Sequence, residues 1–177
     1  SVYTPKYVSQ YTVDNNYSMA FDGTGYISLG SSINIGKENT IAFWMYKTGT
    51  HTVVVGEGSY GSDYTIYISS TQGTYYRVGG AAVWNYTIPN NTWKHVAFTR
   101  NQTVLKLYVD GDFIGLNNGG GITNSTDSKF DTIGDKSNGS HDGGPAPFVG
   151  KLDEFAAWDK ELTADQIKFD IYGASTT

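Results

Sequence analysis

The sequence predicts an all-β protein with one short helix near the C-terminal end. Runs of β-branched and aromatic residues recur between clusters of Gly, Asn and Ser, and almost no segment has the 3.6-residue period of an amphipathic helix. The 22 glycines and 14 tyrosines, with only 16% charged residues, suit strands, turns and an exposed polar surface. A chain of 177 residues can bury a full core as a single domain without metals or disulfides.

The predicted strands are short and closely spaced. Segment 41–46 is apolar on both faces, with Phe43 and Met45 on one face and Trp44 and Tyr46 on the other. This pattern predicts a central strand that is covered on both sides. Other strands are expected at 26–29, 52–55, 64–69, 74–78, 81–86, 94–100 and 104–109.

A hairpin is expected after the last of these strands. Asp110-Gly111 follows Val109, and the apolar pair Phe113-Ile114 begins the return. Asp and Gly tolerate the positive φ values of a two-residue hairpin turn, so the turn is predicted at this dipeptide.

The predicted helix begins at a capping box. Thr163 is the expected N-cap and Gln166 stands three residues later, so each side chain can bond a backbone N–H of the other's residue. Leu162 and Ile167 are spaced as the hydrophobic staple that accompanies such a start.

Composition excludes several classes of function. There is no cysteine, so no disulfide, thiolate metal site or thiol nucleophile is available. The net charge of −5 and the lack of a basic run argue against nucleic acid as a partner. Apolar stretches are too short for membrane insertion. The Asn-, Ser- and Thr-rich composition favours an extracellular, cell-surface or virion-surface location, and we expect the chain to be part of a larger protein.

Four ordered blocks resemble the laminin-G-like domain family, and Trp158 with 162–167 also fits. The blocks are 21–27, 40–45, 92–99 with 107–111, and 148–155. The resemblance implies a two-sheet antiparallel jelly-roll sandwich of the concanavalin A-like kind over residues 17–177, with 1–16 as an extension or an extra edge strand. It also implies recognition of glycans or proteins, often with a bound calcium ion, although a fold alone does not determine function.

Glycosidases on this fold need two carboxylates that face one cleft. Asp153 and Glu154 are adjacent, so on a regular strand their side chains point to opposite faces, which argues against catalysis. The histidines, His51, His95 and His141, are far apart and lack the spacing of a zinc site. For His95 we expect a structural role.

Calcium is the most plausible ion, because oxygen ligands are plentiful. One possible site uses Asp22 and Asp153, although Asp22 ahead of Gly23 is equally typical of a turn residue. A second possible site lies on the rim of the loops, where segment 134–144 is also typical of ordinary solvated loop. Its ligands would come from Asp63, Asp127, Asp135, Asn138 and Asp142.

Sugar binding needs aromatic faces flanked by polar groups. The aromatic candidates outside the core-like blocks are Tyr60, Tyr64, Tyr75, Tyr76, Trp84 and Tyr86. Trp44, Trp93 and Trp158 are expected in the core, and Trp84 is equally compatible with the core and with an exposed platform. The expected ligand contacts are Tyr60, Asp63, Tyr64, Trp84, Asn138 and Asp142.

Together these features predict a non-catalytic recognition module that binds a glycan or a surface protein and takes part in adhesion. The alternative is a structural or protein-interaction domain of a phage, viral or cell-surface assembly. A glycoside hydrolase on the same fold is the third possibility.

Overall fold

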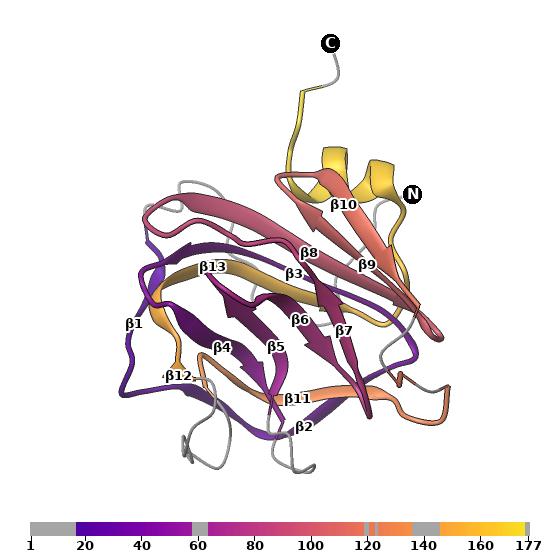
Figure 1. The fold of residues 1–177 in the computed structure, drawn as a ribbon, viewed down its shortest axis with the longest axis horizontal. Helices are drawn as coiled ribbons and strands as arrows, with labels where there is room; N and C mark the ends of the chain where they lie inside the picture. The colour runs from indigo at the N-terminus through magenta and orange to yellow at the C-terminus, as the bar shows by residue number, and fades with distance from the viewer. Residues whose placement is uncertain (1–16, 58–63, 119–120, 123, 136–145, 176–177) are drawn as a thin grey trace.

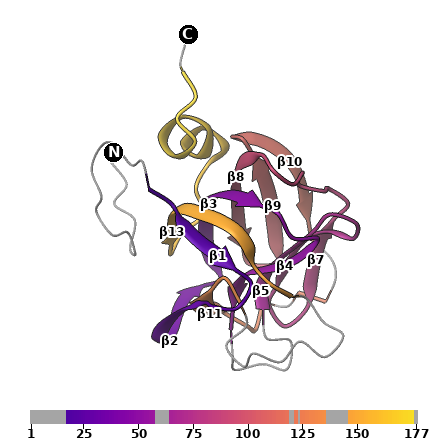
Figure 2. The same ribbon diagram turned by 90° about the vertical axis from the view of Figure 1, so that its left-hand side faces the viewer.

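The structure, a computed structural model, describes residues 17–57, 64–118, 121–122, 124–135 and 146–175. Two sheets pack face to face (Figures 1 and 2). The six-stranded sheet has the order β1 (Met19–Asp22), β13 (Val149–Trp158), β3 (Glu38–Lys47), β8 (Trp93–Asn101), β9 (Val104–Val109) and β10 (Asp112–Asn117). The seven-stranded sheet has the order β2 (Ile27–Gly36), β11 (Ser128–Ile133), β4 (His51–Gly56), β5 (Tyr64–Ser69), β6 (Gly73–Arg77) and β7 (Ala81–Trp84). The short β12 (Ala146–Pro147) pairs with β4.

The architecture confirms the predicted all-β sandwich, and each predicted strand corresponds to an observed one. Pairing between the strands is antiparallel except between β12 and β4, which are parallel. Strand β11 was not predicted, because its sequence, SKFDTI, has charged residues at two of six positions. The expected N-terminal extension, 1–16, lies outside the described residues.

The core lies between the sheets, and period-2 alternation supplies it from both sides. On the six-stranded sheet, Phe43 and Met45 of β3 and Phe98 of β8 are fully buried and belong to the main hydrophobic cluster. Ile66 and Ile68 of β5 enter the same cluster from the other sheet. The alternate residues of β3 and β8 therefore face outward. Where no other segment packs on these residues, the outer face of the sheet is accessible.

The predicted hairpin between β9 and β10 is confirmed. Asp110 has φ 52° and Gly111 has φ 77°, the left-handed values that a two-residue turn of this kind requires. The carboxylate of Asp110 accepts a hydrogen bond from the backbone N–H of His95 at 3.0 Å. The turn is thereby joined to β8.

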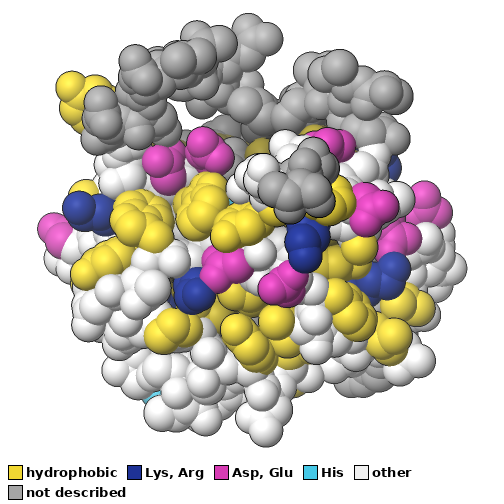
Figure 3. All heavy atoms as spheres, turned by 90° about the horizontal axis from the view of Figure 1, so that it is seen from above, with side chains coloured by type: hydrophobic (Ala, Val, Ile, Leu, Met, Phe, Trp, Pro, Cys, Tyr) yellow, Lys and Arg dark blue, Asp and Glu magenta, His cyan; other side chains and the backbone are white. Residues whose placement is uncertain are grey.

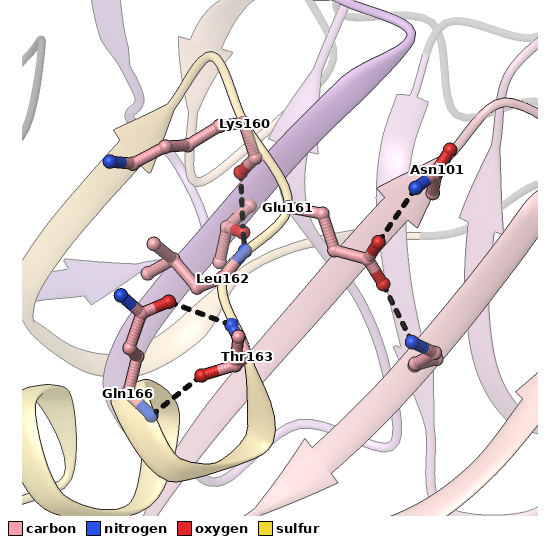
Figure 4. A network of polar contacts seen from close by, with 8 residues as sticks. Asn101, Lys160, Glu161, Leu162, Thr163 and Gln166 are labelled. Carbon is pink, nitrogen blue, oxygen red and sulfur yellow. Dashed lines mark hydrogen bonds and ion pairs between the residues drawn. The ribbon is translucent and has the colours of Figure 1, made fainter.

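The C-terminal segment is held by the predicted capping box (Figure 4). The N–H of Thr163 donates to Gln166 Oε1 at 2.9 Å, and the N–H of Gln166 donates to Thr163 Oγ1 at 3.2 Å. Glu161 accepts from Asn101 and pairs with Lys106, which fixes the segment to β8 and β9. The helix η1 (Gln166–Ile171) that follows has π-type geometry. None of the described helical residues forms a helix long and apolar enough to cross a bilayer.

The C-terminal segment covers only part of the outer face of the six-stranded sheet. Ile167 and Leu162 pack there against a second cluster that includes Ala42, Ala97 and Trp158. The described residues of the C-terminal segment do not pack on the end of β3 at Tyr46 or on the start of β8 at Trp93. The predicted two-sided burial of segment 41–46 therefore holds at Ala42 but not at its end.

One end of the core is closed by a buried polar network centred on Arg100. Its guanidinium donates to Gln102 O, Ser128 Oγ and Thr126 O at 2.8–2.9 Å. The hydroxyl of Tyr76 lies 2.9 Å from the same Ser128 Oγ. Because Arg100 comes from one sheet and Ser128 from the other, the network links the two layers.

Candidate functional site

A half-buried tyrosine and an exposed tryptophan form an aromatic pair on the outer face of the six-stranded sheet, where β3 ends and β8 begins. Tyr46 and Trp93 are direct cross-strand partners, and their ring centroids are 5.8 Å apart with 54° between the ring planes. Trp93 is 39% exposed. Its predicted place in the core is therefore wrong: Trp93 is out of phase with the inward-facing Val96 and Phe98, and η1 does not reach it.

Three further rings extend this pair along the sheet. Trp44 lies next to His95, with centroids 5.4 Å apart, and Tyr172, which follows η1, lies 5.6 Å from Trp44 and 5.8 Å from His95. We call Trp44, Tyr46, Trp93 and Tyr172 the aromatic platform. Figure 3 shows hydrophobic side chains gathered on this face, with acidic and basic groups between them.

His95 lies beneath the rings and is neutral at physiological pH. Burial lowers its pKa to about 4, although the nearby Asp110 carboxylate acts in the opposite direction. Only 2% of the residue is exposed, and its Nδ1 is buried without a hydrogen-bond partner. The structural role expected for His95 agrees with this position.

Beside the platform, β13 is interrupted by a β-bulge. Asp153 is opposite Trp44, but the next paired residue is Ala156, and Glu154 has a left-handed φ of 48°. Leu152 and Phe155 both pack on the core, and Glu154 is exposed, so Asp153 and Glu154 both lie on the outer side of the sheet. The prediction that these carboxylates point to opposite faces is therefore wrong, because it assumed a regular strand.

Two lysines neighbour the aromatic pair, Lys94 in the sequence and Lys151 in the strand register, and they differ in their pairing. Lys151 is exposed on β13 directly opposite Tyr46. Lys94 forms an ion pair with Asp110 at 2.5 Å, and the hydrogen bond that its ammonium donates to the Asp110 carboxylate raises the lysine pKa. Among the residues that the structure describes on β13, Lys151 and Glu154 are exposed charged residues beside the platform.

The two residues of one predicted calcium site, Asp22 and Asp153, are separated in the structure. Asp22 is opposite Val149 in the register, so Asp153 lies four residues further along β13, about 13 Å away. The Asp22 carboxylate instead accepts bonds from the hydroxyl and the N–H of Thr24, which lower its pKa. The turn interpretation of Asp22 is the one that the structure supports.

Two residues of the second predicted calcium site, on the rim of the loops, also lie apart. Asp127 precedes β11 and Asp135 follows it, so the whole strand separates them by roughly 20 Å or more. Asp63, Asn138 and Asp142 lie outside the described residues, and their role as calcium ligands stays a prediction. Among the parts of the chain that the structure describes, no group of three His, Asp or Glu side chains could hold a metal ion.

Of the predicted ligand contacts, Trp84 is placed in the core. It is 6% exposed, its Nε1 donates to Gly115 O at 3.0 Å, and its ring contacts Phe98. An exposed stacking role for Trp84 is therefore wrong, because its alternation on β7 turns it inward. Tyr60 lies outside the described residues with the loop residues named above, and Tyr64 begins β5.

Two other surface features have structural explanations. On the outer face of the seven-stranded sheet, His51, Tyr67 and Ser69 bond one another, and the Ser69 hydroxyl also accepts backbone N–H groups of the following turn. A shallow hollow of about 580 Å³ lies at the opposite end of β3 from Tyr46. Two pairs of its polar side chains bond each other, Asn34 with Asp127 and Gln102 with Glu38.

The family profile described as the concanavalin A-like lectin/glucanases superfamily matches residues 21–168. The chain belongs to this superfamily. The match contains all of the aromatic platform except Tyr172. A comparison with curated proteins found no match.

Solved structures show the same fold at low identity. Domain 4 of AbnA, a GH43 extracellular arabinanase from Geobacillus stearothermophilus in complex with arabinotriose, has a TM-score of 0.60 and 20% identity, covering 85% of this chain and 74% of that one. The Ruminococcus gnavus IT-sialidase CBM40 bound to α2,3 sialyllactose has a TM-score of 0.61 and 18% identity, covering 89% of this chain and 96% of that one. The SAP-like pentraxin of Limulus polyphemus has a TM-score of 0.60 and 16% identity, covering 84% of this chain and 78% of that one. The fold thus occurs in a domain of an arabinanase, in the CBM40 of a sialidase and in a pentraxin.

Proposed function

We propose that this domain is a non-catalytic glycan-recognition module and that the aromatic platform is its binding surface. The observation that carries the proposal is the exposed Trp93 beside Tyr46 on the outer face of the six-stranded sheet. The apolar faces of sugar rings pack on such rings, because both surfaces lose contact with water together. We propose that the ammonium of Lys151, which is exposed on β13 opposite Tyr46, donates hydrogen bonds to sugar hydroxyls.

The comparisons support this proposal at the level of the fold. Two neighbours are bound to arabinotriose and to α2,3 sialyllactose, and the arabinanase is extracellular. By analogy we propose a glycan as partner and a secreted or surface location, with adhesion as the biological role. The analogy does not extend to individual binding residues, since the sequence identities are 20% or less.

Replacing Trp93 by alanine is expected to weaken glycan binding about tenfold or more, because a central aromatic anchor contributes about 2 kcal/mol or more. The free energy of unfolding should change by no more than about 1 kcal/mol, because Trp93 is substantially exposed. Affinity is measured by calorimetry with a glycan identified on an array.

Phe113→Ala is the matched control for this variant. Phe113 is also an exposed aromatic residue of the six-stranded sheet, at 53%, but it lies on the edge strand β10. We expect its glycan affinity to equal that of the parent. Equal binding by Trp93→Ala and the parent would exclude the platform as the binding surface.

The proposed non-catalytic role has to be tested at Asp153 and Glu154. The bulge brings both carboxylates to the same side of β13, and glycosidases use two carboxylates that face one cleft. We expect no new reducing ends after prolonged incubation with the best glycan ligand. Product formation that disappears in Glu154→Gln would show that the domain is an enzyme.

A protein-interaction role is the second candidate. Phe113 and Leu116 on the edge strand β10 are more than half exposed. Exposed apolar residues on an edge strand are typical of surfaces that pair with another chain. A glycan array without binders, together with an assembly that Leu116→Lys disrupts, would favour this alternative.

A further inference from the structure

We infer that Tyr172 is a specificity-determining residue of the aromatic platform, where it selects unbranched glycan chains over densely branched ones. This inference rests on the proposed function and specifies the class of ligand. It follows from the position of Tyr172, which stands as a wall beside the part of the platform that the described C-terminal segment leaves uncovered.

Cross-strand pairs of outward-facing residues form successive rows on β3 and β8. The row of Ala42 and Ala97 packs beneath the C-terminal segment. The row of Trp44 and His95 comes next, and both of its rings contact Tyr172. The following row is the aromatic pair, on which the described C-terminal residues do not pack. Tyr172 therefore marks the border between the covered and the uncovered part of the sheet.

Tyr172 stands above the level of the sheet. It follows η1, which packs on the outer face of the sheet (Figure 2), and its ring centroid lies 5.6 Å from that of Trp44 and 5.8 Å from that of His95. His95 points outward but is only 2% exposed, as expected for a ring that is covered from above. Tyr172 itself is half-buried, so part of this residue stays accessible to a ligand.

Tyr172 is held in place by contacts to the hairpin and to η1. Gly111 in the hairpin turn approaches the ring so closely that an added Cβ would lie 2.9 Å from Tyr172 Cδ1. The N–H of Tyr172 donates to Ile167 O at 2.8 Å, and Lys168 of η1 forms an ion pair with Asp112 of β10 at 3.0 Å. A ring that is packed in this way resists displacement, so it can reject a ligand group by steric overlap.

A sugar that stacks on the aromatic pair has Tyr172 along one edge. Tyr46 follows Trp44 on the same face of β3, about 7 Å further along the strand, and Tyr172 lies over Trp44. The row Lys151, Tyr46 and Trp93 runs across three adjacent strands, a span of about 10 Å, so a chain that follows this row keeps the wall on one side. A branch on the facing edge would need the space that Tyr172 fills. Successive sugars turn different edges to the wall, so dense branching is disfavoured in either direction of binding.

Tyr172 lies outside the part of the chain that the superfamily profile matches. That match ends at residue 168, whereas Tyr46 and Trp93 lie inside it. The aromatic pair thus belongs to the matched region, and the wall is added by the C-terminal segment of this chain. Selection against branches is therefore expected to be a property of this chain rather than of the fold.

The test compares unbranched and branched forms of the same glycan. The probes are linear and branched arabinan, sparsely and densely substituted arabinoxylan, and an array of oligosaccharides that contains both forms of each core. For each core that binds, we expect the parent to bind the unbranched form about tenfold or more tightly than the branched form. Tyr172→Ala should reduce this preference to less than about threefold, mainly because the branched form binds better.

Three further variants separate the wall from other effects. Tyr172→Phe keeps the shape of the ring without its hydroxyl, so its preference should stay within about twofold of the parent's. Tyr172→Leu is shorter but still apolar over His95, and its preference should fall below about half of the parent's. It serves as the second test where Tyr172→Ala does not fold. Phe169→Ala is the matched control, because it removes another exposed ring of the C-terminal segment that is not part of the platform, and its preference should equal the parent's.

The outcomes separate this inference from the proposed function. If the parent binds no glycan, or if Trp93→Ala binds as well as the parent, the proposed function fails. If Trp93→Ala weakens both forms and the parent binds them equally, the platform binds glycans but Tyr172 does not select them. A preference that survives in both Tyr172→Ala and Tyr172→Leu would overturn the inference in the same way.

Discussion

Replacing Arg100 by methionine is expected to lower the free energy of unfolding by about 3–5 kcal/mol. Arg100 is fully buried, and its guanidinium supplies donors to Gln102 O, Ser128 Oγ and Thr126 O. Methionine fills a similar volume but leaves these acceptors without the donor, and each buried unsatisfied group costs about 1–3 kcal/mol. A domain of this kind has only about 5–15 kcal/mol in total, so the variant should fold but be marginal.

Urea unfolding followed by tryptophan fluorescence measures this effect. Arg100→Lys is the matched control, because a single ammonium retains the charge near Asp127 but cannot reach three acceptors at once. We expect the lysine variant to be intermediate. A loss below about 1 kcal/mol in Arg100→Met would mean that water replaces the guanidinium and that the network contributes little to joining the sheets.

The parts of the fold that depend on local sequence were predicted correctly. The turn at Asp110-Gly111 needs only two residues that tolerate positive φ, and the capping box needs only Thr163 and Gln166 at the right spacing. Both signals lie within a few residues. Neither depends on what the rest of the chain does.

Whether an outward-facing residue is buried or exposed depends on segments far away in the sequence. Trp93 and Ala97 both face outward from β8, but Ala97 is covered by the C-terminal segment and Trp93 is not. The sequence of β8 alone gives the same alternation in both cases. The alternation of Trp93 with the apolar Val96 and Phe98 was nevertheless visible in the sequence. It could have shown that Trp93 faces away from the core.

The bulge in β13 was hidden for a different reason. Glu154 has a left-handed φ although Glu carries no preference for that region, so its residue type gives no warning. The bulge is imposed by packing, since it lets Leu152 and Phe155 both face the core, where Phe155 stacks on Phe43. A tertiary constraint of this kind leaves no local pattern.

The second large effect concerns His95 and pH. Its folded-state pKa is about 4, because burial disfavours the charged ring, whereas an unfolded histidine titrates near 6.5. Between these values the unfolded chain binds a proton that the folded chain does not. Stability therefore falls as the pH is lowered from about 6.5 to about 4, by up to about 3 kcal/mol from this group, and this contribution is fully present above pH 6.5.

His95→Phe isolates this contribution. Phenylalanine keeps a ring beside Trp44 and Tyr172, and the replaced Nδ1 has no hydrogen-bond partner to lose. The difference in unfolding free energy between variant and parent should grow in favour of the variant as the pH falls from 7 to 4.5. The other nearby titratable groups, Asp110 and Lys94, are common to both proteins and cancel in this difference.

An NMR titration of the imidazole protons gives a second reading of the same property. We expect the His95 signals to keep the shifts of the neutral ring down to about pH 5. Parallel stability profiles for parent and His95→Phe, with a His95 midpoint near 6.5, would mean that solvent reaches the ring between Trp44 and Tyr172. The inner half of the platform would then be open, and Tyr172 could not be a fixed part of the surface that meets the glycan.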